Sequence, residues 1–335
     1  MTVIAQIGVG NWGRNLLRNL AAIEGVEVRW AVELSEARRK EIARQYPDTR
    51  AVDSPDPVFA DPAVECVVLA TTAETHYPLA KAALLADKHV YVEKPLTLSS
   101  AHARELVELA ESRKRTLMVG HLLEYHPAVL KLKDLIQSGE LGDLYYVYSQ
   151  RLNLGQIRAD EDAIWSLAPH DISVICFLLE ATPVSVSARA GAYVRPEVAD
   201  VGFVTLTFPG GRVGNVHVSW LDPHKIRRFT VVGSRKMAVF DDMESLEKIR
   251  IYDRGADTKV AFSPFGDNVS LRFGDVLIPR IELAEPLALE CRHLIDCIRT
   301  GKTPRSDGRD GLRVVQVLEA AHRSLAAGGA PVPLP

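Results

Sequence analysis

The first 120 residues alternate between short apolar runs and segments whose apolar residues recur at helical spacing. The runs, rich in valine and isoleucine, predict strands at residues 3–7, 26–32, 66–70, 90–92 and 117–119. Helices are predicted between them, at residues 14–23, 37–45, 77–86 and 101–113. Because strands that alternate with helices form parallel sheets, this part of the chain predicts a doubly wound Rossmann fold.

After residue 121 the pattern changes to consecutive strands. A helix is predicted at residues 127–137, and strands at 144–152, 184–190, 201–208, 212–220, 229–232, 237–241 and 249–252. Pro209-Gly210-Gly211 is typical of a hairpin turn between two of them. Strands that follow one another directly predict a mostly antiparallel sheet. Two helices, at 286–299 and 311–326, precede a proline-rich end that we expect to fray.

These patterns predict an α/β protein of two domains. The first is a Rossmann domain over residues 1–121. The second, over residues 122–327, is an α+β domain built on a large, open and mostly antiparallel sheet. Its last helix is a candidate to pack back on the Rossmann domain.

Composition and charge exclude several classes of protein. The 335 residues are 47% apolar and 25% charged, and the formal net charge of −3 argues against a nucleic-acid-binding surface. No apolar run reaches the roughly 20 residues that span a bilayer, and no basic leader opens the chain, so we expect a cytoplasmic protein without a membrane partner. The four cysteines form no C-x-x-C pair, so neither disulfides nor a metal site is expected.

A glycine motif follows the first predicted strand. Gly8, Gly10 and Gly13 fit G-x-G-x-x-G, with Asn11 and Trp12 at the variable positions, and the motif opens a helix as a dinucleotide site requires. Gly8 allows the tight turn, Gly10 lets a pyrophosphate approach, and Gly13 lets helix and strand pack closely. The helix N-terminus offers free N–H groups to the phosphates.

An acidic residue ends the second predicted strand. Glu33 lies 20 residues after Gly13 (33 − 13), where a carboxylate accepts hydrogen bonds from both ribose hydroxyls and repels a 2′-phosphate. The cofactor predicted is therefore NAD, although Arg38 and Arg39 nearby weaken the preference over NADP. The alternative is a glycine turn with an unrelated surface glutamate.

A lysine follows the strand that ends near residue 92. Glu93-Lys94-Pro95 stands at the carboxyl end of this strand, the edge where open α/β sheets bind ligands. Lys94 can act there as an acid or base, or as a cation that orients a substrate hydroxyl. Taken alone, such a lysine is more often a solvated surface residue.

Further motifs complete a resemblance. Four motifs occur in this order: the glycine motif, Ala70-Thr71-Thr72 with His76, Glu93-Lys94-Pro95 and Gly120-His121. On these motifs and their order, the chain resembles the Gfo/Idh/MocA family of oxidoreductases over nearly its whole length. The resemblance implies that Lys94 is catalytic. It also implies a place beside the cofactor for Thr71, Thr72, His76 and Glu93. A position at the start of a helix is the alternative for His76. His121 stays open between a hinge, a pocket and a packing role.

The family carries a second catalytic group in a D-x-x-x-H segment of the sheet domain. The matching stretch runs from Ser166 to His170, so His170 matches the family histidine and Ser166 replaces the aspartate. Pro169 is expected to open a helix, which places His170 in its first turn, where the dipole favours neutral imidazole. Asp171 is expected to stabilise that turn. A capping or packing histidine is the alternative.

Other segments are similar to the nucleotide-sugar 3-dehydrogenases within this family, which oxidise UDP-N-acetylglucosamine or its uronic acid to a 3-keto sugar. Arg151 and Asn153 alternate along one strand and therefore face one side. We expect them to bind the sugar, together with Arg158, Trp165, Ser166 and His170. A diphosphate is expected to meet Lys225, Arg227 and Arg228. Ordinary sheet-surface cations are the alternative for these residues.

Two other functions stay open. A dehydrogenase of free inositol or of a monosaccharide needs no diphosphate site, so the cluster at residues 225–228 discriminates. A non-catalytic NAD-binding regulator needs neither Lys94 nor His170. Which of these two side chains is the base is also open. One face of the sheet is left to cover, which predicts a homodimer or homotetramer through the sheet domain.

Overall fold

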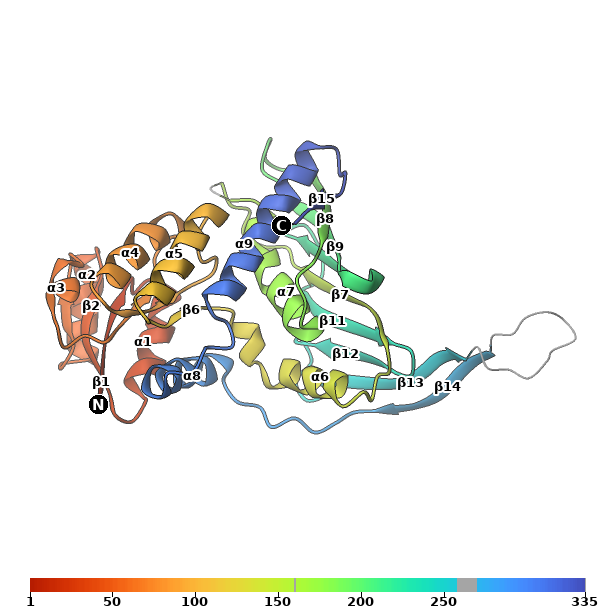
Figure 1. Ribbon diagram of the computed structural model, residues 1–335, viewed down its shortest axis with the longest axis horizontal. Helices are drawn as coiled ribbons and strands as arrows, with labels where there is room; N and C mark the ends of the chain where they lie inside the picture. The colour runs from red at the N-terminus through yellow and green to blue at the C-terminus, as the bar shows by residue number, and fades with distance from the viewer. Residues whose placement is uncertain (160, 258–269, 335) are drawn as a thin grey trace, which may run out of the picture. The chain divides into compact units, whose positions relative to one another are not determined.

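The computed structural model describes residues 1–159, 161–257 and 270–334, which divide into two compact units. Unit 1 comprises Met1–Tyr125 and Ala284–Gln316, and unit 2 comprises His126–Leu283 and Val317–Pro335. Figure 1 labels the elements of both.

Unit 1 is built on a six-stranded parallel sheet in the order β3-β2-β1-β4-β5-β6. This is the order of a doubly wound dinucleotide-binding sheet, and it confirms the predicted fold class. The strands are β1 (Thr2–Ile7), β2 (Val26–Val32), β3 (Arg50–Val52), β4 (Cys66–Leu69), β5 (His89–Val92) and β6 (Leu117–Val119). The sequence analysis missed β3, because three residues are too few to show a periodic pattern.

Helices surround this sheet, and one of them comes from the far end of the chain. They are α1 (Gly13–Ala21), α2 (Glu36–Gln45), α3 (Asp56–Ala60), α4 (Ala73–Leu85), α5 (Ser100–Ser112), the short 3₁₀ helix η1 (Leu122–Tyr125) and α8 (Pro286–Thr300). Residues 284–316 thus group with unit 1, whereas the sequence analysis assigned them to the second domain. The reason is packing: Leu287, Cys291 and Leu294 of α8 share a core cluster with Leu16 and Leu20 of α1.

Unit 2 is built on a nine-stranded sheet in the order β14-β13-β12-β11-β7-β10-β9-β8-β15. All neighbours pair antiparallel except β7 and β10, which are parallel. The strands are β7 (Leu144–Leu152), β8 (Ser185–Gly191), β9 (Val201–Thr207), β10 (Val213–Ser219), β11 (Ile226–Gly233), β12 (Met237–Asp241), β13 (Ile249–Asp257), β14 (Ser270–Leu277) and β15 (Val332–Pro333). The mostly antiparallel sheet is therefore confirmed.

Turns and ends of this sheet test two finer expectations. The turn Pro209–Gly211 joins β9 to its antiparallel neighbour β10, so the predicted hairpin is confirmed. The expectation of a frayed C-terminal end is wrong, because β15 pairs with β8 and the Leu334 N–H donates to the Val184 carbonyl at 3.0 Å.

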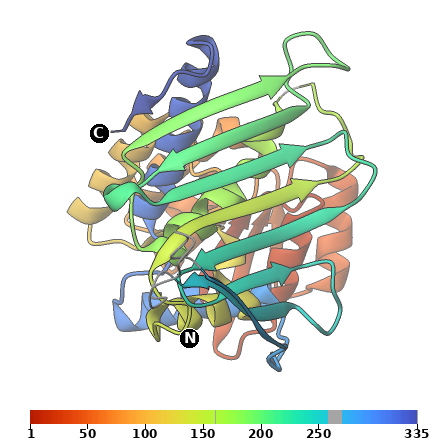
Figure 2. The ribbon, with the colours of Figure 1, turned by 90° about the vertical axis from the view of Figure 1, so that its right-hand side faces the viewer.

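Two helices pack on one face of the sheet in unit 2. They are α6 (Pro127–Gln137), which contacts β12, and α7 (Ala163–Leu179), which contacts β7, β9 and β10. Figure 2 shows the sheet face-on, and within the described residues no helix of unit 2 lies over the face turned to the viewer. α9 (Gly308–Ala326) begins in unit 1 and ends in unit 2.

The start of α7 differs from the prediction. The helix begins at Ala163, where Asp162 caps it by accepting from the Trp165 N–H at 2.9 Å, and Pro169 lies inside it. His170 is thus the eighth helical residue, in the third turn. The helix dipole therefore has little effect on His170, because that effect fades within the first turn.

Among the described residues, no helix is long and apolar enough to cross a bilayer.

Candidate active site

The glycine motif forms a tight loop between β1 and α1. Gly8 has a φ of +89°, and a Cβ there would lie 2.6 Å from the Ala70 carbonyl oxygen. A Cβ on Gly13 would lie 2.3 Å from the Gly8 carbonyl oxygen, so only glycine allows helix and loop to pack this closely. A Cβ on Gly10 would meet only the Arg38 guanidinium, at 3.6 Å. The loop therefore leaves space above Gly10, where a pyrophosphate fits.

Glu33 holds the loop from the end of β2. One carboxylate oxygen accepts from the Val9 N–H at 3.1 Å, and the other accepts from the Ser35 N–H at 3.0 Å. The Arg38 guanidinium lies 3.9 Å from the first of these oxygens. Two backbone bonds fix the carboxylate and leave lone pairs for ribose hydroxyls. The first turn of α1 contains no acidic residue and no side-chain cap, which suits an anionic ligand.

The segment after β5 is held by the glycine loop. The indole N–H of Trp12 donates to the Glu93 carboxylate, and the Lys94 backbone N–H donates to the same carboxylate at 3.2 Å. Lys94 is half-buried at the carboxyl edge of the sheet. The cofactor loop and the candidate catalytic lysine are thus linked through one carboxylate.

His76 lies in the first turn of α4, in agreement with the expectation of a helix-start residue. It is buried, and its Nδ1 lies 2.8 Å from the Pro95 carbonyl oxygen while its Nε2 lies 3.3 Å from that of Thr71. Burial lowers the pKa of His76, which keeps the ring neutral. A neutral ring has one N–H, and donation from Nδ1 to the nearer Pro95 carbonyl ties the first turn of α4 to the turn after Lys94.

The two threonines stand where β4 ends. The Thr71 hydroxyl accepts from that of Thr75 at 2.7 Å, and Thr72 is the N-cap residue of α4. Both lie at the carboxyl edge, next to the glycine loop, as the expected cofactor contact requires.

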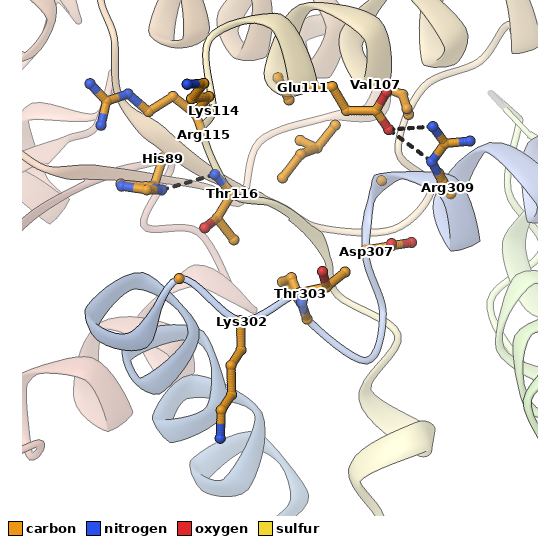
Figure 3. Close-up of a pocket in the computed structure, with 15 residues that line it drawn as sticks. His89, Val107, Glu111, Lys114, Arg115, Thr116, Lys302, Thr303, Asp307 and Arg309 are labelled. Atoms are coloured by element: carbon orange, nitrogen blue, oxygen red, sulfur yellow. Dashed lines mark hydrogen bonds and ion pairs between the residues drawn. The ribbon is translucent and has the colours of Figure 1, made fainter.

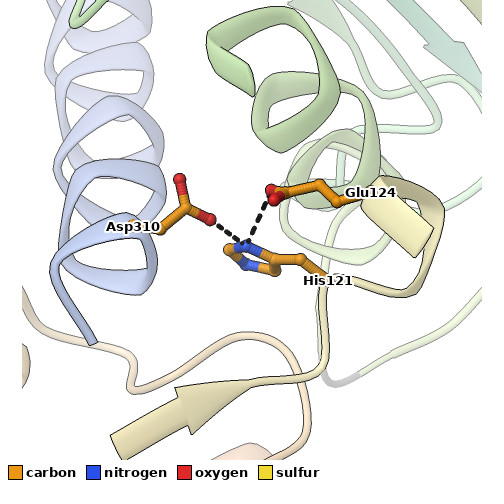
Figure 4. A group of neighbouring side chains, drawn as sticks. All are labelled: His121, Glu124 and Asp310. Atoms are coloured by element: carbon orange, nitrogen blue, oxygen red, sulfur yellow. Dashed lines mark hydrogen bonds and ion pairs between the residues drawn. The ribbon is translucent and has the colours of Figure 1, made fainter. Parts of the chain in front are cut away.

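His121 belongs to a buried ion cluster (Figure 4). Its Nδ1 lies 2.5 Å from the Asp310 carboxylate and 3.6 Å from that of Glu124, and Arg313 also pairs with Asp310. Burial lowers the pKa of His121, but the two carboxylates outweigh it and raise the pKa to about 10. Although imidazole and carboxylates are metal-ligand types, Nδ1 already donates to Asp310. The cluster is therefore an ion pair with a packing role, joining the segment after β6 to α9.

In unit 2 the structure brings two predicted site elements together. Arg151 on β7 donates through Nε to the Asp171 carboxylate on α7 at 2.5 Å, and both side chains are buried. Asp171 thus fixes Arg151 beside the turn of α7 that carries His170, and it has no role in a first turn. Asn153 follows the end of β7, where its N–H donates to the Ser219 carbonyl at 3.1 Å.

The expected diphosphate cluster is divided between two faces of the sheet. Arg227 lies opposite Arg151 in the β11–β7 register, so both point to the face that α7 covers. Arg228 points to the other face, where it pairs with Asp241 at 2.6 Å. Since one diphosphate cannot contact both faces, Arg228 is removed from the predicted cluster. Lys225 is exposed, and Arg227 lies 3.7 Å from Asp242.

The remaining predicted substrate residues lie around the start of α7. Arg158 is half-exposed and pairs with Glu161. The ring of Trp165 lies 5.8 Å from that of His322, and Ser166 is buried in the second turn of the helix. His170 is half-buried on α7 in unit 2, whereas Lys94 belongs to unit 1.

A pocket of about 380 Å³ lies elsewhere in unit 1, at the amino ends of β5 and β6 (Figure 3). His89 accepts there from the Thr116 N–H at 2.9 Å, and Arg309 pairs with Glu111. Parallel sheets bind ligands at the opposite, carboxyl edge, so this pocket is separate from the cofactor edge.

The buried carboxyl groups of unit 1 that local spacing did not predict include Asp310 and Glu290. Asp310 stands 189 residues after His121, and Glu290 lies on α8 with neither carboxyl oxygen accepting a hydrogen bond. No local spacing marks either residue, because their partners come from distant parts of the chain.

Family models match both halves of the chain. Residues 3–121 match the oxidoreductase family with an NAD-binding Rossmann fold, and residues 129–239 match the GFO/IDH/MocA C-terminal domain. The UDP-N-acetylglucosamine 3-dehydrogenase of Acidithiobacillus ferrooxidans is 30% identical over 312 residues, which cover 92% of each chain. This chain belongs to the Gfo/Idh/MocA family. It is an NAD-dependent oxidoreductase that acts on alcohol groups, as the motifs predicted.

Solved structures of similar proteins have the same fold. That of the Acidithiobacillus ferrooxidans enzyme has a TM-score of 0.81 at 28% identity, over 97% of each chain. GenD2 from gentamicin A biosynthesis, in complex with NAD, has a TM-score of 0.83 at 26% identity and covers 100% of this chain and 96% of its own. The scyllo-inositol 2-dehydrogenase of Bacillus subtilis is 25% identical over 98% of this chain and 95% of its own.

Substitution by alanine should have different effects at Gly10 and Gly13, the second and third glycines of the motif. Gly13→Ala forces a Cβ against the Gly8 carbonyl and should lower the melting temperature measured by circular dichroism. Gly10→Ala meets open space, so it should leave the melting temperature within about 2 °C of wild type, a shift that corresponds to less than about 1 kcal/mol. It should nevertheless weaken NAD binding at least about tenfold in calorimetry, since the methyl group stands where the pyrophosphate approaches. Unimpaired NAD binding by Gly10→Ala would contradict this placement.

Proposed function

We propose that this enzyme oxidises a secondary hydroxyl, at C3, of a nucleotide sugar such as UDP-N-acetylglucosamine or its uronic acid. The observation that carries the proposal is the 30% identity to a UDP-N-acetylglucosamine 3-dehydrogenase, which extends over 92% of both chains. This similarity includes the sheet unit, where a sugar would bind. By contrast, the inositol 2-dehydrogenase of Salmonella typhimurium is 30% identical over only 52% of this chain.

The sheet unit offers matching chemistry on one face. Arg151 is fixed by Asp171 beside the turn that carries His170, and it presents a planar donor group suited to sugar hydroxyls or an acetamide oxygen. Arg227 lies on the same face, one strand away, where a diphosphate would find a cation together with the exposed Lys225. Asn153, Arg158, Trp165 and Ser166 complete the proposed substrate site.

The cofactor would be held along the carboxyl edge of the parallel sheet. The pyrophosphate would be surrounded by the glycine loop, that is by Gly8, Gly10, Asn11, Trp12 and Gly13. Glu33 would bind the adenosine ribose. The nicotinamide half of the cofactor would lie beside Thr71, Thr72 and Glu93. When bound, NAD supplies the carbon that accepts a hydride. The protein must then orient the alcohol and receive its proton, for which we propose His170 as the base and Lys94 as the cation that stabilises alkoxide charge.

Absorbance at the nicotinamide wavelength tests the function directly. We expect NADH to form with UDP-N-acetylglucosamine or its uronic acid, and not with myo-inositol, scyllo-inositol or free N-acetylglucosamine. Turnover of a free cyclitol alone would establish the alternative, a dehydrogenase of inositol or a monosaccharide, which the Bacillus subtilis relative favours.

Glu33 should determine the choice of cofactor. In Glu33→Ala, NAD loses the acceptor for its ribose hydroxyls while NADP loses a repulsive charge near Arg38, so the ratio of the NAD to NADP dissociation constants should rise at least about tenfold. Calorimetry with both cofactors measures this ratio. Glu36→Ala, an exposed acid in the first turn of α2, is the matched control and should leave it unchanged. An unchanged ratio in Glu33→Ala would refute the ribose assignment.

The two candidate catalytic residues should affect turnover more than cofactor binding. His170→Asn and Lys94→Met are each expected to lower kcat by about 10²–10⁴-fold, the usual effect of losing a general base or its partner. The dissociation constant of NAD should change less than about threefold in His170→Asn. Near-normal kcat in both variants with a verified substrate would exclude this mechanism.

We also propose that the enzyme is a homodimer or homotetramer that associates through the uncovered sheet face. Three apolar side chains are exposed on this face, one each on β7, β9 and β10: Tyr146, Phe203 and Val213. The Phe203 ring stacks on the His217 ring, with 4.3 Å between the ring centroids. Phe203→Glu should convert the assembly to monomers in light scattering. Leu246→Glu, at an exposed leucine between β12 and β13, is the control. A wild-type monomer would disprove this proposal.

A cytoplasmic location fits the same proposal. All four cysteines are free and buried, as expected in a reducing compartment.

A further inference from the structure

Two glutamates lie near each other in unit 1, the half-buried Glu93 at the cofactor edge and the fully buried Glu290 on α8. Glu93 follows β5 and Glu290 lies on α8; burial raises the pKa of both, and the charge of Glu93 raises the pKa of Glu290 further. Two carboxylates in one buried region cannot both ionise cheaply, so one of them must carry a proton. Which one does so decides where negative charge lies in this part of the protein.

Hydrogen-bond donors surround Glu93, and they indicate that Glu93 carries the negative charge. Its carboxylate accepts from the indole N–H of Trp12, from the Tyr91 hydroxyl at 3.2 Å and from the Lys94 backbone N–H at 3.2 Å. Glu290 is fully buried, and neither of its carboxyl oxygens accepts a hydrogen bond. A carboxylate with three donors is stabilised as the anion, whereas one without donors stays neutral. Glu93 is therefore the anion and Glu290 the neutral acid.

A small residue makes this arrangement possible. A Cβ on Gly120 would lie 2.6 Å from the Tyr91 hydroxyl and 2.9 Å from the Glu93 carboxylate, so the absence of a side chain lets both groups pack against the backbone after β6. Burial is the main cause that raises the pKa of Glu290 well above its usual range, and the charge of Glu93 adds to it, while the nearby Tyr91 hydroxyl acts in the opposite direction.

The order of the strands places this anion on the nicotinamide side of the cofactor. The pyrophosphate fits over the glycine loop at the end of β1, and the adenosine ribose extends towards Glu33 at the end of β2. In the order β3-β2-β1-β4-β5-β6, the other half of the cofactor must extend over β4 and β5, where Glu93 stands. The nicotinamide ring is cationic in NAD⁺ and neutral in NADH, so a fixed negative charge there acts on only one of the two redox states.

We propose that Glu93 is a positioning residue that makes the protein bind NAD⁺ in preference to NADH, with Trp12 holding its carboxylate and Glu290 remaining a neutral companion. The inference rests on the cofactor placement of the proposed function, but not on the identity of the sugar. Tighter binding of NAD⁺ than of NADH loads the enzyme with the oxidised cofactor before the alcohol binds.

Binding of the two cofactor forms tests the proposal without any substrate. Dissociation constants of NAD⁺ and NADH are measured by calorimetry for wild type, Glu93→Gln and Glu290→Gln. Loss of the Glu93 charge should raise the ratio of the NAD⁺ to NADH dissociation constants about tenfold, equivalent to about 1.4 kcal/mol. Glu290→Gln is the matched control: it replaces one neutral, buried side chain by another of the same shape and should change the ratio less than twofold.

A third variant keeps the test decisive if Glu93→Gln folds poorly. Trp12→Phe keeps a ring at a half-exposed position but removes the N–H donor, and it should shift the ratio in the same direction by about two- to fivefold, because one of three donors is lost. Equal weakening of NAD⁺ and NADH in Glu93→Gln and Trp12→Phe would show a purely structural role and overturn the proposal. A shift of the ratio by Glu290→Gln as large as that by Glu93→Gln would also overturn it, by placing the charge on Glu290.

The outcome is distinguishable from failure of the proposed function. A shifted ratio in a protein that oxidises no nucleotide sugar would reject the substrate assignment and retain the role of Glu93. An unchanged ratio in an active nucleotide-sugar dehydrogenase would retain the substrate assignment and reject the role of Glu93.

Discussion

The close packing of α1 against the end of β1 is the contact on which the cofactor edge depends. It exists because Gly13 has no Cβ to meet the Gly8 carbonyl, which would otherwise lie 2.3 Å away. The packing brings the N-terminus of α1 over the strand ends. From there Val9 donates to Glu33 after β2, and Trp12 donates to Glu93 after β5. One loop thus holds the charged groups that follow two separate strands.

The C-terminal segment that returns to unit 1 completes its buried polar groups. Glu290 on α8 supplies the neutral acid near Glu93, and Asp310 on α9 supplies the anion that keeps a proton on His121. A buried charge without such a partner costs several kcal/mol. Residues 284–316 are therefore part of the electrostatics of the Rossmann unit as well as of its apolar core.

In unit 2 a buried ion pair connects the sheet to the helix that carries His170. Arg151 and Asp171 satisfy each other between β7 and α7, so the guanidinium has one orientation rather than many. The same strand geometry separates Arg227 from Arg228, because neighbouring residues of a strand point to opposite faces. The sheet thereby divides its cations between the helix-covered face and the open one.

Local pattern was sufficient for the elements whose signal is local. The range of α6 and those of β7 and β12 agree with the periodicity at every residue, and the glycine motif, Glu33 and Glu93-Lys94-Pro95 were found from spacing and order alone. The family resemblance added His170. Short elements such as β3 and α3 carry too few residues for a period, and β15 exists only because β8 offers it a partner.

The amino-acid sequence by itself determined the fold class, the family, the cofactor and the candidate catalytic pair. Only the tertiary structure decided that α7 starts at Ala163, that His76 supports a turn and that Arg228 faces away from Arg151. It alone also showed that Asp171 fixes Arg151 and that Glu93 has Glu290 as a buried neighbour. Periodicity and motif spacing depend on residues close together in the chain. Burial, ion pairing and the location of a proton depend on groups that meet only when the chain folds.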